Sequence, residues 1–126
     1  HSFPYIACSA HPQSSVGIDI QVIREKTLHI QDRFLHVLEA KKYRDNLMYT
    51  SIIWCAKEAM YKYLGTGGQE FKTDFLIQDI IKTEQPHIYD MKAVIYPDKA
   101  QAENILLRAH VYTDVIMAYT IPNQNF

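Results

Sequence analysis

An amphipathic helix that runs from about residue 45 or 46 to Leu64 is the feature that most constrains how this chain can fold. Apolar residues recur along it at spacings of three or four, as on one face of an α-helix: Met48, Ile52, Cys55, Ala59 and Tyr63. Gly65 marks its end, because glycine readily adopts the left-handed backbone that stops many helices. A helix of this kind must bury its apolar face against a second layer.

The second layer is predicted to be a sheet, because the residues after the helix have the pattern of β-strands. Four strands are expected there, at about residues 74–80, 87–96, 102–112 and 115–121. Thr113 and Asp114 fit a tight hairpin turn between the last two. Consecutive strands with such short connections pair in antiparallel fashion.

The residues before the long helix are predicted to add two strands, a short helix and a connection. The strands are expected at residues 3–10 and 16–21, antiparallel because a short turn joins them. A short helix is expected from Thr27, as its N-cap, to residue 34 or 35. The polar residues 41–46 are expected to connect it to the long helix.

The whole chain, residues 1–126, is therefore predicted to be a single α+β domain, with one long helix packed on a mostly antiparallel sheet. Hydrophobic residues make up 48% of it, and the net charge of −1 gives no general attraction to nucleic acid or anionic membranes. No apolar run approaches the ~20 residues that span a bilayer. Cys8 and Cys55 are expected to be free thiols in a reducing compartment, which favours a cytoplasmic protein.

Two acidic residues stand in positions that suit chemistry. Asp19 lies near the end of an apolar strand, and Glu58 lies on the long helix beside Lys57 and Lys62. The simpler interpretation makes Asp19 a turn-capping residue, and Glu58 with Lys62 a helix pair worth ~0.2–0.5 kcal/mol. If the helix face meets the strand end, however, two carboxylates converge. Carboxylates and lysines together suit magnesium and a diphosphate.

The order of these motifs resembles the 4′-phosphopantetheinyl transferase superfamily. The matching elements are Gly17-Ile18-Asp19, then Arg33-Phe34-Leu35 with Glu39, then Trp54-x-x-Lys57-Glu58-Ala59-x-x-Lys62-x-x-Gly65. The sequence is similar to the second half of the surfactin-synthetase-activating type. Its length is like that of the short holo-acyl-carrier-protein synthase class.

The resemblance implies roles for individual residues. Asp19 and Glu58 would be the metal ligands, with Gln21 contributing through a bound water. Lys57, Lys62 and His1 would contact the phosphates of coenzyme A. Glu58 and Lys62 would be the catalytic residues, with Glu58 helping to deprotonate the attacking serine.

The resemblance also implies a reaction and a partner. Mg²⁺, with Mn²⁺ as the alternative, would assist transfer of 4′-phosphopantetheine from coenzyme A to a serine of an acyl or peptidyl carrier protein, as in fatty acid biosynthesis. Nucleic acid and membranes are not expected as partners.

Three features keep other interpretations open. Gln21 stands where many relatives have an acid, so a degenerate member that binds coenzyme A or a carrier protein without turnover is the alternative function, and a purely structural domain is a third. Only one of two pseudo-repeated halves is present, which predicts either a homo-oligomer or a missing N-terminal half. His1 is also consistent with a processing or tag remnant.

The segment from Arg24 to Arg44 is the most basic part of the chain. It holds six basic residues (Arg24, Lys26, Arg33, Lys41, Lys42 and Arg44) against three acids (Glu25, Asp32 and Glu39), an excess of 6 − 3 = +3. We interpret it either as ordinary solvated charge or as a docking surface for an acidic carrier protein.

Overall fold

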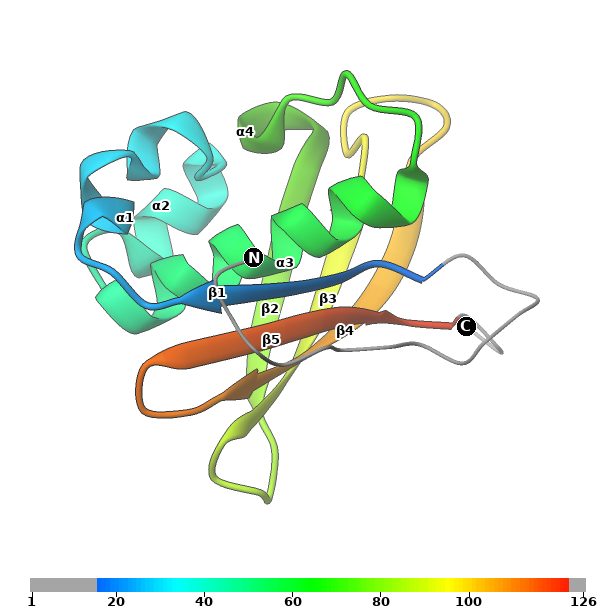
Figure 1. Cartoon of the computed structure of the whole chain (residues 1–126). Helices are drawn as coiled ribbons and strands as arrows, with labels where there is room; N and C mark the ends of the chain where they lie inside the picture. The colour runs from blue at the N-terminus through cyan, green and yellow to red at the C-terminus, as the bar shows by residue number, and fades with distance from the viewer. Residues whose placement is uncertain (1–15, 123–126) are drawn as a thin grey trace.

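Five antiparallel strands form the sheet that was predicted from the sequence. The computed structural model describes residues 16–122, and in these residues the strand order is β1-β5-β4-β3-β2 (Figure 1). The strands are β1 (Ile18–Val22), β2 (Phe75–Lys82), β3 (Ile88–Ile95), β4 (Glu103–Val111) and β5 (Val115–Ile121). Strands β2 to β5 are consecutive in sequence and lie side by side. β1 precedes the long helix in sequence and pairs with β5.

The helices lie on one face of this sheet. The long helix α3 (Leu47–Leu64) runs across the face, with the short helices gathered beside it (Figure 1). These are α1 (Lys26–His29), the 3₁₀ turn η1 (Gln31–Arg33), α2 (Val37–Tyr43) and α4 (Phe71–Asp74). The fold class is α+β, as predicted, and no helix within residues 16–122 is long and apolar enough to cross a membrane.

Both ends of α3 are set by local chemistry. The Asn46 side chain accepts a hydrogen bond from the backbone N–H of Tyr49 at 2.9 Å, which satisfies one free donor of the first turn. At the other end, Gly65 has φ +70°, the left-handed conformation that glycine adopts without strain. The predicted end at Leu64 is confirmed, and the helix begins at Leu47, one or two residues later than predicted.

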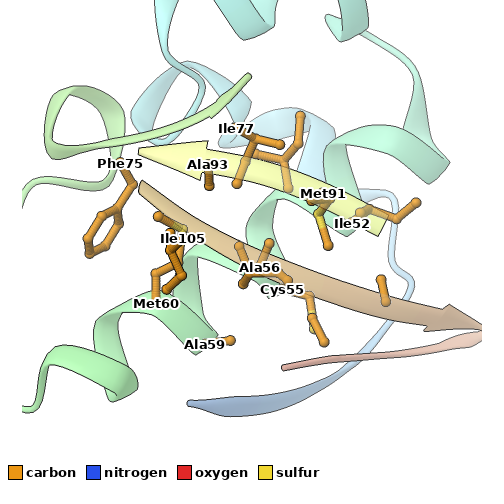
Figure 2. Close-up of a cluster of buried hydrophobic side chains, with 14 of the residues drawn as sticks. Ile52, Cys55, Ala56, Ala59, Met60, Phe75, Ile77, Met91, Ala93 and Ile105 are labelled. Atoms are coloured by element: carbon orange, nitrogen blue, oxygen red, sulfur yellow. The ribbon is translucent and has the colours of Figure 1, made fainter. Parts of the chain in front are cut away.

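The main core lies between α3 and the sheet. Figure 2 shows small and medium-sized helix residues against the inner face of the strands; on α3 they are Ile52, Cys55, Ala56, Ala59 and Met60. All five are fully buried, as are their sheet neighbours Met91 and Ala93. The small residues Ala56 and Ala59 let the helix approach the strands closely.

Gly17, just before β1, allows the closest approach between that strand and α3. A Cβ atom at this position would lie 1.8 Å from the carbonyl oxygen of Ala59. Only glycine therefore fits here. The N–H of Gly17 donates to Thr120 Oγ1 at 2.9 Å, which anchors the start of β1 to β5.

The region before α3 differs from the prediction. Thr27 is not an N-cap but a buried residue inside α1, whose N-cap is Glu25. Residues 41–46 are not simply a connection, because α2 extends to Tyr43. The capping box of His36 and Glu39 starts this helix, and the short helix α4 was also not predicted. The strand predicted at residues 3–10 lies outside the described residues.

Candidate active site

Asp19 lies on the side of β1 that faces α3. It pairs in register with the buried Ala118 of β5, and its side chain is only 2% exposed. One carboxylate oxygen, Oδ1, accepts a hydrogen bond from the Lys62 ammonium group at 2.7 Å. The other, Oδ2, accepts one from the Gln21 amide at 2.6 Å. Two predicted site residues thus contact the Asp19 carboxylate directly.

Glu58 lies one helical turn before Lys62 on α3, and it is half-buried. Burial raises the pKa of the Glu58 carboxyl group, and the nearby negative charge of Asp19 raises it further, while Lys62 lowers it. Within residues 16–122, no hydrogen bond or ion pair engages the Glu58 carboxylate. The contact of Lys62 with Asp19 at 2.7 Å brings this part of α3 to β1, as predicted for the helix and the strand end.

The donor set at this point fits a divalent cation. Asp19 is near enough to Glu58 for its charge to raise the pKa of the Glu58 carboxyl group, and one lysine, Lys62, pairs with Asp19. In the part of the chain that the structure describes, no cluster of three or more His, Cys, Asp or Glu side chains could hold a metal. Magnesium sites with one or two carboxylates are usual where substrate phosphates and water supply the other ligands. Asp19 and Glu58 would hold such an ion.

Lys57 has a different environment from Lys62. Its ammonium group is fully buried, at 2.8 Å from Glu39 Oε1, 2.7 Å from the Phe34 carbonyl oxygen and 2.8 Å from the Phe71 carbonyl oxygen. Burial lowers the pKa of Lys57 to about 8. The ammonium group is thus enclosed by protein rather than presented to a ligand, and the structure brings Lys62 but not Lys57 to Asp19.

Glu39, on α2, is the partner that sequence reasoning left without a role. It is 1% exposed, and burial raises the pKa of its carboxyl group despite the neighbouring Lys57. It also accepts hydrogen bonds from the backbone N–H groups of His36, at 2.8 Å, and Ile77, at 2.6 Å. The pair therefore joins α2, α3, β2 and the start of α4. The signal in the sequence for a buried partner was that Glu39 is an acid in an otherwise apolar turn.

The remaining predicted residues are placed as follows. Trp54 packs between Phe34 and Phe71, with ring centroids 5.1 Å and 5.4 Å away. Cys55 is buried against the strands, where its thiol donates to the carbonyl oxygen of Asp19 at 3.3 Å. His1 lies outside the described residues.

The basic segment from Arg24 to Arg44 lies on the helices that flank α3. Its six basic residues are all exposed, although Arg44 forms an ion pair with Asp32 and Lys42 donates to the Gln78 carbonyl oxygen at 3.2 Å. Among them on α2 lie two exposed apolar side chains, Val37 at 61% and Leu38 at 48%. The surface thus combines positive charge with an apolar patch.

Comparison with known proteins adds one finding. The family model for the 4′-phosphopantetheinyl transferase superfamily matches residues 15–118, from just before β1 into β5. The match includes Asp19, Glu58 and Lys62 and most of the chain. No curated protein sequence matches the chain.

Proposed function

The chain belongs to the 4′-phosphopantetheinyl transferase superfamily, and from this premise we propose that it moves 4′-phosphopantetheine from coenzyme A to a serine of an acyl or peptidyl carrier protein, with Mg²⁺ or Mn²⁺ as the assisting ion. Family membership makes the protein a phosphopantetheine transferase in general terms. The metal, the carrier protein and the holo-acyl-carrier-protein synthase type are the finer parts of the proposal.

The convergence of Asp19, Glu58 and Lys62 is the observation that carries this proposal. Lys62 of α3 and Asp19 of β1, distant in sequence, are 2.7 Å apart, and the charge of Asp19 acts on Glu58, one helical turn before Lys62. Transfer of a phosphoryl-type group depends mainly on positioning and on neutralising charge. A divalent cation held by Asp19 and Glu58 would supply that neutralisation at the diphosphate.

The protein's own side chains would carry the other tasks. Lys62, on its flexible stem, would bind the diphosphate of coenzyme A. The serine oxygen forms a bond to the β-phosphorus as the bond to the bridging oxygen breaks, and adenosine 3′,5′-bisphosphate leaves with the electron pair. The serine proton passes to Glu58, directly or through water. The raised pKa of Glu58 makes it a stronger base than an ordinary glutamate.

Two predicted coenzyme A contacts have less support. The enclosed ammonium group of Lys57 faces Glu39 and two carbonyl oxygens, so we assign no phosphate contact to it in this conformation. His1 remains a prediction from the sequence. The Gln21 amide donates a hydrogen bond to Asp19. This contact supports the proposal that Gln21 contributes to the metal site through a bound water.

We propose the basic surface from Arg24 to Arg44 as the docking site for the carrier protein. Exposed positive charge would attract an acidic helical partner, and Val37 and Leu38 would supply apolar contact area.

Gln21 favours a second candidate function. A neutral amide here supplies less attraction for a divalent cation than an acid would, which supports a member that binds coenzyme A or a carrier protein without turnover. The two candidates make different predictions about the carrier's mass.

The deciding experiment combines the protein with coenzyme A, Mg²⁺ and an apo-carrier protein. We expect the carrier to gain the mass of 4′-phosphopantetheine, and a carrier with its acceptor serine changed to alanine to gain nothing. Stabilisation by coenzyme A without any mass gain would support the binding protein. If the carrier gains no mass and coenzyme A does not stabilise the protein, both candidate functions are wrong.

A further inference from the structure

The contact between Lys62 and Asp19 is unusual for a lysine that is expected to bind a substrate phosphate. The ammonium group lies 2.7 Å from Asp19 Oδ1, an oxygen that a metal ion would need. Gln21 already uses the other oxygen, Oδ2. Asp19 therefore has both oxygens engaged by donors of this chain.

The two partners differ in freedom to move. Asp19 is held on β1 with its side chain 2% exposed, whereas the Lys62 side chain is 41% exposed on a stem of four carbons. An ammonium group and a divalent cation repel each other at contact distance, so the Lys62 contact at Oδ1 disfavours binding of the ion to the same oxygen. When an ion binds there, Lys62 is the group that can move away.

We propose that Lys62 is an internal counter-cation: it neutralises Asp19 in the metal-free protein, leaves Asp19 when a divalent cation binds, and only then becomes available to an anionic diphosphate. This inference rests on the proposed function, because it assumes that Asp19 and Glu58 are the metal ligands. It assigns Lys62 a second role, in setting the order and affinity of binding.

Two consequences follow from the competition. The free protein binds a divalent cation more weakly than its two carboxylates alone would, because the ion must displace Lys62. The cation also releases the lysine that a diphosphate needs, so cation and coenzyme A each increase the affinity for the other by the same factor.

Metal titration in the absence of coenzyme A tests the first consequence. We expect Lys62→Met to bind Mn²⁺ about tenfold more tightly than the wild type, measured by the loss of the free-ion signal in electron paramagnetic resonance, which corresponds to ~1.4 kcal/mol of competing attraction. Lys62→Arg, which keeps the positive charge, should not bind more tightly. An unchanged or weaker affinity in Lys62→Met would overturn the inference.

Amine reactivity tests whether Lys62 itself leaves Asp19. A general change of charge at the site would not explain a change in the reactivity of this one lysine. The protein is treated with a limiting acylating reagent, with and without saturating Mn²⁺, and each lysine is quantified by mass spectrometry. We expect Mn²⁺ to raise the modification of Lys62 several-fold, with exposed Lys99 as the unchanged internal reference. In Asp19→Asn, Lys62 should be reactive from the start and insensitive to Mn²⁺.

The outcomes separate this inference from the proposed function. If Mn²⁺ leaves the reactivity of Lys62 unchanged or lowers it, the counter-cation role is wrong, even if the wild type still modifies a carrier protein. If Mn²⁺ exposes Lys62 but no carrier is modified, the counter-cation role stands and the transferase proposal fails.

Discussion

At the scale of single residues, the two lysines of one helix motif have opposite environments. Lys57 is enclosed and paired with Glu39, whereas Lys62 is part-exposed and contacts Asp19. They are five positions apart along α3, so they project from different sides of the helix. We therefore expect their substitution to affect different properties of the protein.

Glu58 is the residue through which pH should control the reaction. Because burial and the charge of Asp19 raise the pKa of Glu58, its base form is lost on acidification sooner than that of an ordinary glutamate. We expect kcat/KM to fall on acidification, because a protonated Glu58 can neither hold the cation nor accept the serine proton, and Glu58→Gln to lose roughly 10²-fold or more in kcat with the fold intact. A pH series of transfer rates with a circular dichroism control measures both. If Glu58→Gln transfers at the wild-type rate, Glu58 does not belong to the site.

The pair of Lys57 and Glu39 should matter mainly for stability. Removing one partner of a buried ion pair leaves an uncompensated charge, so Lys57→Met should lower the free energy of unfolding by about 3–5 kcal/mol. The double variant Glu39→Gln, Lys57→Met should recover much of this loss. Urea unfolding of the three proteins tests the expectation, and equal loss in the single and double variants would contradict it.

The same lysine gives a pH dependence of known sign. Lys57 has a pKa of about 8 in the folded protein and 10.5 as its ordinary value, so the unfolded state binds its proton more tightly. The protonated form of Lys57 therefore lowers the free energy of unfolding below pH 8, and this destabilisation disappears as pH rises from about 8 to 10.5. We expect the unfolding free energy of the wild type, relative to the double variant, to increase between pH 8 and pH 10. A difference that shrinks over this range would contradict the assignment.

At the scale of secondary structure, the approach of β1 to α3 creates the site. β1 carries Asp19 and Gln21, and α3 carries Glu58 and Lys62. The two elements touch most closely at Gly17, where no side chain fits. A glycine two residues before an aspartate is thus explained by packing as well as by the resemblance of its motif.

Gly17→Ala should separate the strand from the helix. The added Cβ would overlap the Ala59 carbonyl group, so we expect a loss of about 2–4 kcal/mol in stability together with weaker metal binding. Gly68→Ala is the matched control, because open space surrounds Gly68 and only its φ of +86° disfavours alanine, at about 1 kcal/mol. Melting temperatures and Mn²⁺ titration compare the two. Equal behaviour of both variants would contradict the packing argument.

At the scale of the whole molecule, the sheet places the proposed chemistry and the proposed docking surface on one side. The basic helices lie beside α3 on one face of the sheet (Figure 1). Asp19 is on the same face, because it contacts Lys62 of α3. A carrier protein bound there would present its serine on the same face as the proposed ligands Asp19 and Glu58. Charge at this surface should thus act on the encounter rather than on the chemistry.

Reversal of charge at Arg24 or Arg33 should raise the KM for the carrier protein and leave the KM for coenzyme A nearly unchanged. The effect should be largest at low salt, because exposed charges act over only ~8 Å at physiological ionic strength. Lys99→Glu, on an exposed lysine outside the basic segment, is the matched control. If both reversals leave the carrier KM unaltered at low salt, the docking surface is wrong and the catalytic assignment is untouched.

The sequence by itself determined the long helix, the strands after it and the identity of the candidate site. Helix period, strand pattern and turn residues are local properties, so α3, β2 to β5 and the turn before Val115 were predictable within a few residues. The resemblance of its motifs to the superfamily proposed Asp19, Glu58 and Lys62 as one site, and the structure brings Lys62 to Asp19. The region of α1 and α2 was predicted less well, because a capping box and the buried Glu39 decide its helices.

Only the tertiary structure decided which lysine faces which partner. In sequence, Lys57 and Lys62 belong to one motif, and their spacing places them on different sides of the helix without saying what each side meets. Their environments depend on α2, α4 and β1, which supply Glu39, the Phe71 carbonyl group and Asp19 from distant parts of the chain. Charge burial and competition for a carboxylate oxygen arise only when those elements pack around α3, since both effects depend on distances that the order of residues does not contain.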